Sequence, residues 1–494
     1  MSLAVIYTRA KSGINAPLVT VEVHLSNGLP SLNIVGLPET AVKESKDRVR
    51  SALLNSHFDF PARRITINLA PADLPKEGGR FDLPIALGIL AASGQLPTDT
   101  LKDYEFIGEL ALSGELRPVN GTLPSALACG KSQRSIILPH SNSAEATLAS
   151  NTCVYAGKHL LEVCAHLKHS ETLPQQSRSQ NKNRNTAPTA DINEVIGQHQ
   201  AKRALEIAAA GAHNLLFSGP PGTGKTMLAS RLPGILPELD ESEALEVAAV
   251  YSVNSNTPRN YFFERPFRSP HHTSSSVSLV GGGGNPRPGE VSMAHHGVLF
   301  LDELPEFSRK VLEVLREPLE SGSILIARAQ ASIEYPAKFM LIAAMNPCPC
   351  GYFGETRCRC TPDQVNRYRD KISGPLLDRI DLQVNVPRVP HRELTSNDPA
   401  GENSITVRQR VISAREKQQR RQACSNAQLS RKQIDQFCPL DEEQLEIMNA
   451  AIERMGLSAR GFHRILKVAR TIADLDGQEK IQKRHLSEAL AYRL

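Results

Sequence analysis

Tryptophan is absent from this 494-residue sequence, aromatic residues make up only 5% of it, and cysteine occurs nine times. The core must therefore be mainly aliphatic, and such a sparse, odd set of cysteines excludes a disulfide scaffold. Long apolar runs are also lacking. The run at residues 3–7 is too short for a signal-peptide core, and nothing approaches the length of a membrane span. We therefore expect a cytoplasmic protein with no membrane partner, whose thiols stay reduced.

The length and the polar stretches indicate three domains. At roughly 150 residues per domain, 494 residues favour three. Residues 171–190 are polar and lack periodic apolar positions, so we expect a linker after a first domain at 1–170. A second polar stretch, "TSNDPAGENS", separates a middle domain at 191–394 from residues 395–494. Ile, Leu, Val and Ala recur there with helical spacing, which predicts a small helical domain.

The charge is mildly basic overall and concentrated locally. The formal net charge is +5, and residues 408–432 alone hold eight basic residues and one acidic residue. A stretch of this kind suggests a polyanionic partner such as nucleic acid. The alternative is an ordinary solvated helix face.

The middle domain contains a phosphate-binding loop. In "NLLFSGPPGTGKTML", an apolar strand precedes a glycine-rich loop and a helix start. The glycines let backbone N–H groups face phosphates, and the helix N-terminus adds partial positive charge. Lys225 is expected to reach the β- and γ-phosphates of ATP, and the Thr226 hydroxyl to ligate Mg²⁺. The alternative is a glycine-rich turn without a ligand, which would require Gly219, Gly224, Lys225 and Thr226 to match the motif by accident. The expected nucleotide-binding residues are Gly219, Pro220, Pro221, Gly222, Thr223, Gly224, Lys225 and Thr226.

Two further strands end in polar side chains. "HGVLFLDELPEF" places Asp302 and Glu303 just after an apolar run, which fits a metal-holding Asp and a water-activating Glu. "KFMLIAAMNP" ends in Asn346, whose amide could orient the attacking water and sense the γ-phosphate. The alternative for the acidic pair is a strand followed by a charged turn.

Four of the nine cysteines cluster at 346–360, as Cys348, Cys350, Cys358 and Cys360. In a reducing compartment, C-x-C repeated after seven residues is a plausible spacing for tetrahedral Zn²⁺ held by four thiolates. Such a site would be structural, because four protein ligands leave no open position. A redox-active thiol pair and unliganded cysteines are the alternatives.

The motifs "GPPGTGKT", "LFLDE" and "AAMNP" together resemble an AAA+ ATPase. "PLLDRIDL" resembles the arginine-finger segment of the magnesium-chelatase and MCM-helicase branch. That resemblance implies that Arg379 serves the neighbouring subunit's nucleotide in a ring, expected to be hexameric. "LSARGFHRILKVAR" resembles the sensor-2 helix, with Arg460 at the matching position. The alternatives for both arginines are surface or salt-bridge roles.

Two insertions resemble those of the same branch. "SPHHTSSSVSLVGGGGNPRPGEV" resembles a helix-2 insert, which faces the ring pore. "SGSILIARAQASIEYPAKFML" resembles a pre-sensor-1 hairpin, in which Arg328 matches a basic DNA-contacting position. Such a side chain would pair with phosphate without reading bases. A solvated turn is the alternative for Arg328.

The first domain carries the most specific resemblance. "GLPSLNIVGLPETAVKESKDRVRSALLNS", "ITINLAPADLPKEGGRFDLPIALGIL" and "IGELALSGELRPVNG" resemble the ComM/YifB family, and the likeness extends over the whole chain. The family's first domain resembles the Lon protease fold. Lon-type proteolysis needs a Ser nucleophile and a Lys base close together. The Ser would fall where this chain has Gly79, Arg80, Phe81 and Asp82. The Lys would fall in "VNGTLPSALAC", where no Lys occurs until Lys131. The resemblance therefore implies a domain that is not proteolytic.

The resemblance implies a multidomain α/β protein. It would have a Lon protease-like (ribosomal S5 domain 2-like) α+β domain, a central AAA+ P-loop α/β domain and a C-terminal helical lid. The implied activity is that of an ATP-dependent, ring-forming DNA motor, a branch-migration helicase of natural transformation. Its ligands would be ATP, Mg²⁺, structural Zn²⁺ and DNA of any sequence. The alternatives are a magnesium-chelatase-type ATPase subunit, a regulatory AAA+ scaffold without helicase activity and, more remotely, a Lon-type protease.

Overall fold

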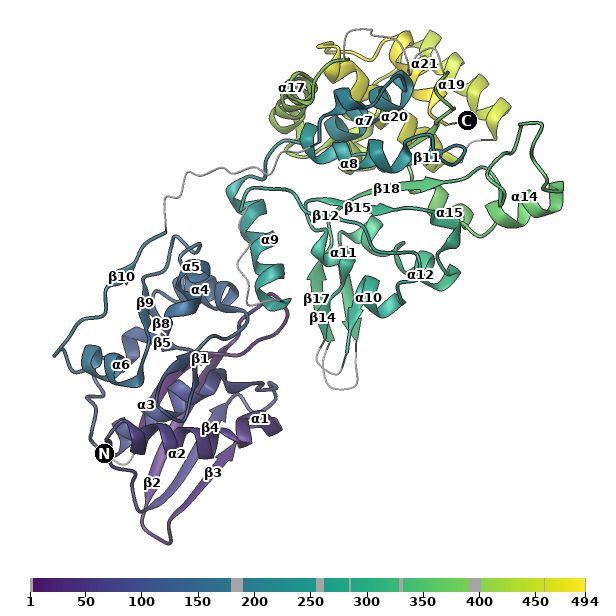
Figure 1. Ribbon diagram of the computed structural model, residues 1–494. Coiled ribbons are helices and arrows are strands. Elements are labelled where there is room, and N and C mark those ends of the chain that lie inside the picture. Colours follow the sequence, from purple (N-terminus) through teal and green to yellow (C-terminus); the bar gives the residue numbers. More distant parts are fainter. Residues whose placement is uncertain are drawn as a thin grey trace.

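The computed structural model of the chain describes residues 3–178, 190–254, 262–283, 286–327, 332–390, 401–456 and 458–493. Figure 1 shows an N-terminal lobe and a second lobe that contains the middle and C-terminal parts. The expected DNA-contacting residue Arg328 lies outside the described residues. Among the helices described, none combines the length and apolar character that a membrane span requires.

The N-terminal lobe is built on one eight-stranded sheet, in the order β10-β9-β8-β5-β1-β2-β4-β3. In β2, buried and more exposed positions alternate, as expected for a strand with one face on the core. Helix α3 is buried along its whole length and packs against β1 and β2. The elements of this lobe are β1 (Leu3–Arg9), β2 (Leu18–Ser26), β3 (Ser31–Val35), α1 (Thr40–Lys43), α2 (Ser45–Asn55), β4 (Arg64–Ala70), η1 (Gly79–Phe81), α3 (Asp82–Ala92), η2 (Leu101–Asp103), β5 (Tyr104–Phe106), β6 (Glu109–Leu110), β7 (Leu116–Arg117), α4 (Thr122–Lys131), β8 (Ser135–Pro139), η3 (His140–Asn142), α5 (Ser143–Ala146), β9 (Val154–Gly157), α6 (Leu160–Leu167) and β10 (Gln175–Gln176).

The last strand of this sheet lies in the stretch whose composition predicts a linker. Strand β10 pairs with β9, so the sheet extends beyond residue 170 into residues 171–190. The sequence did not predict this strand because β10 is a two-residue edge strand of polar residues, one exposed and one partly exposed.

The middle part holds a five-stranded parallel sheet in the order β12-β15-β18-β11-β19. Strands β15 and β18 are buried at every position, which explains their unbroken apolar runs. The elements are η4 (Ile192–Glu194), α7 (His199–Gly211), β11 (Leu215–Ser218), α8 (Lys225–Ile235), α9 (Glu241–Asn254), β12 (Phe267–Arg268), α10 (Ser276–Val280), β13 (Gly281–Gly282), β14 (Arg287–Pro288), α11 (Glu290–Met293), β15 (Val298–Leu301), η5 (Leu304–Glu306), α12 (Arg309–Val314), α13 (Pro318–Ser321), β16 (Ser323–Ala327), β17 (Ser332–Pro336), β18 (Met340–Met345), α14 (Pro362–Arg369), α15 (Gly374–Leu377) and β19 (Leu382–Asn385).

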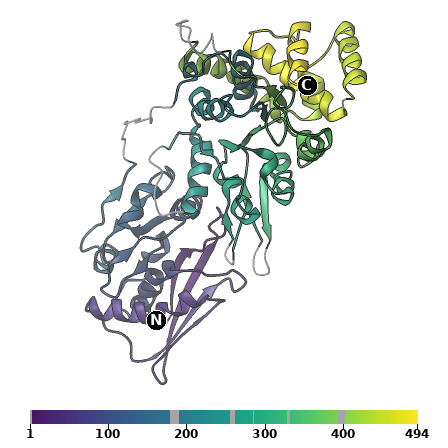
Figure 2. The ribbon, with the colours of Figure 1, turned by 45° about the vertical axis from the view of Figure 1, so that its right-hand side comes forward.

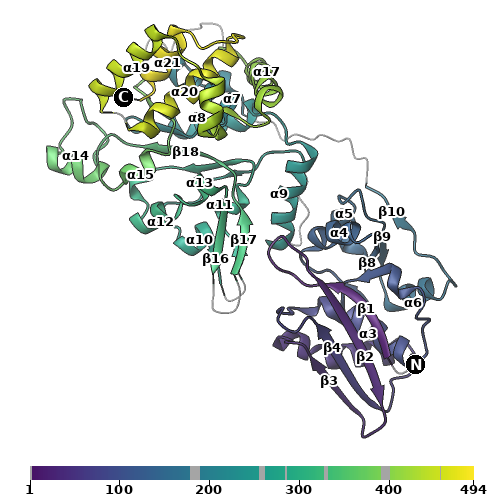
Figure 3. The ribbon, with the colours of Figure 1, turned by 180° about the vertical axis from the view of Figure 1, so that it is seen from behind.

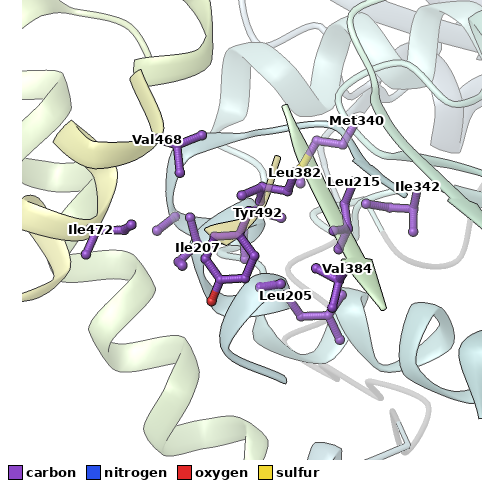
Figure 4. Close-up of a cluster of buried hydrophobic side chains, with 14 of the residues drawn as sticks. Leu205, Ile207, Leu215, Met340, Ile342, Leu382, Val384, Val468, Ile472 and Tyr492 are labelled. Carbon is purple, nitrogen blue, oxygen red and sulfur yellow. The ribbon is translucent and has the colours of Figure 1, made fainter. Parts of the chain in front are cut away.

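The C-terminal part is helical, which confirms the prediction from spacing. Its elements are α17 (Ser404–Gln422), η6 (Asn426–Gln428), α18 (Arg431–Phe437), α19 (Glu442–Met455), α20 (Ala459–Leu475) and α21 (Lys483–Ala491). Figure 4 shows Val468 and Ile472 of α20, and Tyr492, near side chains of α7 and of three strands. This packing holds the helices against the sheet. One hydrophobic cluster therefore joins the middle and C-terminal parts.

Helix α9 connects the two lobes, as Figures 2 and 3 show from two further directions. Its Leu245 and Ala248 pack against a hydrophobic cluster of the N-terminal lobe. Near its C-terminus the Ser252 carbonyl accepts a hydrogen bond of 2.9 Å from the Gly121 N–H. In the other direction, Ile14 of the N-terminal lobe packs against a cluster that includes Tyr335 of β17. The N-terminal lobe thus contacts both α9 and the β16–β17 hairpin.

Candidate functional site

The expected nucleotide-binding residues gather at the carboxyl edge of the parallel sheet. The loop 219–224 follows β11, Asp302 follows β15, and Asn346 follows β18. These three strands are neighbours in the sheet, so their ends meet. Open α/β sheets place ligands in this position, outside the carboxyl ends of the strands.

Lysine 225 lies inside the glycine-rich loop. Gly222 and Gly224 have φ angles of +77° and +88°, a conformation that favours glycine, and they wrap the loop around the start of α8. The Lys225 ammonium donates to the carbonyls of Gly219 at 2.7 Å and Pro220 at 2.9 Å, and to Asn346 Oδ1 at 3.1 Å. Burial lowers the pKa of Lys225, and the carboxylates of Asp302 and Glu303 oppose that shift. These carbonyl contacts are ones that a phosphate could replace.

A hydroxyl and a carboxylate next to this loop suit a hard cation. The Thr226 hydroxyl donates to Asp302 Oδ2 at 2.6 Å. Oxygen ligands of this type are those that Mg²⁺ prefers, usually beside phosphate and water. The donor set therefore fits Mg²⁺ bound together with a nucleotide.

Glu303 has a partner that the motifs did not reveal. Its φ of +52° is rare for a residue with a side chain, and its N–H donates to Asp302 Oδ1 at 2.9 Å. Its carboxylate lies 3.3 Å from Nδ1 of His272, in the segment that follows β12. His272 was missed because only the strand order of the folded sheet brings it there.

Asn346 lies near helix α14, which follows the four cysteines. Its backbone lies near the hydroxyl of Tyr368 on α14 and acts to lower the pKa of that phenol. Burial raises the pKa of Tyr368 to about 12, so the phenol stays protonated. The position of the amide thus depends on the loop that connects β18 to α14.

The four cysteines of that loop come together as expected. Their Sγ atoms all lie within 4.8 Å of one another, with 3.4 Å between Cys348 and Cys350 and 3.7 Å between Cys350 and Cys358. Four sulfurs around Zn²⁺ at ~2.3 Å would be ~3.8 Å apart, so the cluster fits a tetrahedral zinc site. Backbone N–H groups of Arg359 and Tyr352 lower the pKa of Cys350 to about 6, which provides one thiolate at neutral pH. A lowered pKa also suits the redox alternative.

The cysteine loop packs directly against the phosphate-binding loop. Gly351 has a φ of +82°, and a Cβ atom there would lie 2.7 Å from Pro221 Cδ. Only glycine allows this approach without a shift of one loop. The cysteine loop therefore contacts the candidate nucleotide site on one side and supports Asn346 on the other.

A second group with metal-ligand residue types, Glu246, His295 and His296, does not fit a metal as arranged. His295 Nδ1 accepts the Lys338 N–H at 3.1 Å, so its proton is on Nε2, 3.0 Å from Glu246 Oε2. That nitrogen has no free lone pair for a cation. His296 Nε2 lies 2.9 Å from the same oxygen. The group instead ties α9 to the sheet.

Arg379 and Arg460 lie together, on a cavity of about 240 Å³ whose lining residues include none from the phosphate-binding loop. Arg379 is 7% exposed and donates to Pro375 O at 2.7 Å and Glu320 Oε2 at 2.5 Å. Arg460 is more exposed and lies 3.9 Å from the other Glu320 oxygen. These ion pairs are what the salt-bridge alternative predicts for the isolated chain. Service to a neighbouring subunit stays a prediction.

Four of the eight basic residues of the stretch 408–432 form ion pairs among the described residues, and two more donate to backbone carbonyls. Arg410 pairs with Glu206 and Glu402, and Arg421 pairs with Asp474. Arg408 and Arg420 also form ion pairs, while Arg415 and Lys417 donate to backbone carbonyls. This favours a structural interpretation of most of the stretch over a polyanion-binding one.

In the N-terminal lobe, Arg80 is one of the four residues, 79–82, at which the resemblance to Lon proteases would place a catalytic serine. It is 5% exposed, and its guanidinium donates to Ser125 Oγ at 2.8 Å. Ser125 in turn donates to Gly121 O at 2.9 Å. The Ser125 hydroxyl is thus held between a guanidinium donor and a backbone carbonyl acceptor.

Three protein-family models match the chain. One described as magnesium chelatase, subunit ChlI, matches residues 191–394, its C-terminal counterpart matches 401–493, and subunit ChlI of Mg-chelatase matches 21–142. The competence protein ComM of Haemophilus influenzae is 54% identical, over 100% of this chain and 98% of that protein. The YifB protein of Escherichia coli is 53% identical, over 100% and 97%. The magnesium-chelatase 38 kDa subunit of Rhodobacter capsulatus is 24% identical, over 63% and 89%.

Proposed function

The chain belongs to the ComM/YifB family of magnesium-chelatase-like ATPases, and from this we propose that it is a ring-forming, ATP-driven DNA motor. We propose that it moves branch points in recombination intermediates during natural transformation, as a hexamer on DNA of any sequence. The observation that carries the proposal is the meeting of Lys225, Thr226, Asp302 and Asn346 at one sheet edge. The identity to a competence protein supports the setting.

In the proposed reaction, each side chain at the sheet edge has one task. Lys225 exchanges its contacts with Gly219 and Pro220 for the β- and γ-phosphates of ATP. Thr226 and Asp302 hold Mg²⁺, which neutralises charge on the phosphates. Glu303 takes a proton from the attacking water, and Asn346 orients that water.

The remaining parts of the proposal concern the ring. Arg379 stabilises charge on the γ-phosphate bound by the neighbouring subunit. Arg328, on the segment between β16 and β17, contacts DNA phosphates from inside the ring. Four cysteines hold a structural zinc ion, and the N-terminal lobe has the Lon-type fold without its protease activity.

A magnesium-chelatase subunit is the second candidate, because three family models carry that description. Against it stands the identity of 54% to a competence protein, compared with 24% to the chelatase subunit. Porphyrin-dependent ATP hydrolysis would favour this candidate, whereas DNA-dependent hydrolysis is expected only of the motor.

The test is ATP hydrolysis without DNA and with single strands, duplex or a four-way junction. We expect stimulation by DNA and conversion of the junction to duplex products only with hydrolysable ATP and Mg²⁺. Lys225→Ala, which keeps the fold but loses the phosphate contact, is the matched control. Junction DNA that stays intact, with hydrolysis unaffected by any DNA, would refute the motor.

A further inference from the structure

Glutamate 320 holds the two arginines that the ring is expected to use. Its carboxylate accepts from Arg379 at 2.5 Å and lies 3.9 Å from Arg460. The Glu320 side chain is 63% exposed, so it is not held in place by burial. Arg379 lowers the pKa of Glu320, which keeps the carboxylate charged at neutral pH.

The surroundings of this carboxylate are strongly cationic. The cavity is lined by five basic side chains and two acidic ones, and the five are Arg379, Arg431, Arg460, Arg464 and Lys467. Within the described part of the chain, Arg379 Nε is also buried without a hydrogen-bond partner. A guanidinium pairs equally well with the oxygens of a carboxylate or a phosphate. Arg464 already pairs with Asp381 and Lys467 donates to Ala427 O, but with Arg379 Nε unpartnered the cavity still has more donor capacity than Glu320 uses.

We propose that Glu320 stands in for the γ-phosphate of the neighbouring subunit's nucleotide: it holds Arg379 and Arg460 ready while the interface is empty and releases them when ATP arrives there. This inference rests on the proposed function, specifically on the service of Arg379 to a neighbour. In the isolated chain Arg379 is 7% exposed and its Nη2 is paired with Glu320, so any other acceptor at that nitrogen has to replace Glu320. Glu320 is thus a positioning residue that restrains hydrolysis until the interface forms.

Glu320 lies on helix α13, which leads directly into the β16–β17 hairpin. Helix α13 ends at Ser321 and passes through Gly322 directly into β16 at Ser323. The Ser321 hydroxyl donates to Ser323 O at 2.8 Å, which joins the helix end to the strand. A shift of the hairpin therefore moves Glu320, so DNA bound at the hairpin would help to free the arginines.

The test compares Glu320→Gln with Glu317→Gln, an exposed glutamate one turn earlier for which the described residues include no ion pair. ATP hydrolysis is measured against protein concentration, with and without DNA. We expect Glu320→Gln to need roughly three- to tenfold less protein for half-maximal activity, because a partly exposed charged pair is lost. Its stimulation by DNA should be smaller, since its rate without DNA is higher. Equal melting temperatures of the two variants confirm that both are folded.

Arg379→Ala tests the shared site, and Glu320→Gln tests the stand-in role of Glu320. If Arg379→Ala hydrolyses ATP as fast as the unaltered protein, the shared site is refuted and this inference with it. If Arg379→Ala is inactive but Glu320→Gln behaves as Glu317→Gln does, only the stand-in role is refuted. A lower maximal rate for Glu320→Gln at every protein concentration would also refute it, because that would show a carboxylate needed to orient Arg379.

Discussion

Loss of one cysteine from the four-cysteine cluster should remove zinc and slow ATP hydrolysis without unfolding the protein. The change is Cys358→Ser, which replaces a strong thiolate ligand with a weakly coordinating hydroxyl. Second-shell changes alone lower metal affinity by about 10- to 100-fold, and loss of a ligand should cost more. Protein purified without a chelator should therefore contain close to one equivalent of zinc per chain, and the variant close to none.

The expected fall in kcat of Cys358→Ser follows from the contacts of the cysteine loop with the glycine-rich loop. Gly351 contacts Pro221 of the glycine-rich loop, and Tyr368 beyond the cysteine loop lies near the backbone of Asn346. A displacement of about 1 Å in positioning groups costs up to about 100-fold in rate. We therefore expect kcat to fall by about 10- to 100-fold, equivalent to about 1.4–2.7 kcal/mol of activation free energy.

The assay combines elemental analysis, steady-state ATP hydrolysis and a thermal melt. Cys153→Ser, at an exposed cysteine of the N-terminal lobe, is the matched control and should keep both zinc and rate. Full zinc retention by Cys358→Ser would refute the site. Zinc loss with an unchanged kcat would refute the link between the loop and the phosphates. A rate that depends on reductant, with no zinc present, would favour the redox alternative.

Four further predictions concern the site and its supports. Arg379→Ala and Lys225→Ala should each be inactive but regain some hydrolysis when mixed, because some interfaces then combine an intact loop with an intact finger; no gain at any ratio would contradict a shared site. Glu303→Gln should bind ATP and DNA but not turn over, which a filter-binding assay with labelled ATP would show. Burial lowers the pKa of His295, so stability is lost as the pH falls below about 6.5; His295→Gln should flatten that loss in urea melts between pH 7 and pH 5. Ile14→Asp should abolish DNA stimulation and spare basal hydrolysis, whereas the control Leu29→Asp changes neither.

The residues expected to bind phosphate could be brought to one place from the sequence because short-range rules determine their positions. A strand, a glycine-rich loop and a helix start fix the position of Lys225 relative to Thr226. Asp302 and Asn346 each follow an apolar run, and parallel strands bring their carboxyl ends to one edge. The cysteine cluster also followed from local spacing, because its four thiols lie within thirteen residues.

Residues whose roles depend on long-range packing could not be found in the same way. The sequence does not distinguish Glu320 from other glutamates. Only the fold brings Arg460 of α20, and Arg379 just after α15, to its carboxylate. The basic stretch looked like a polyanion-binding surface because its partners, such as Glu206 and Asp474, are distant in sequence. Composition counts charges, but only the fold shows which of them are already paired.

The same kind of long-range contact places the N-terminal lobe against the hairpin. A Cβ atom at Gly13 would lie 2.5 Å from Ile333 Cγ2, so backbone and β17 meet with no spare room. Tightly packed surfaces transmit displacement because they cannot be compressed. If the hairpin contacts DNA as proposed, a lobe that also binds α9 through Gly121 would support the hairpin against the load that DNA places on it. Without that support, movement of the hairpin would be absorbed as local flexing before it reached Glu320.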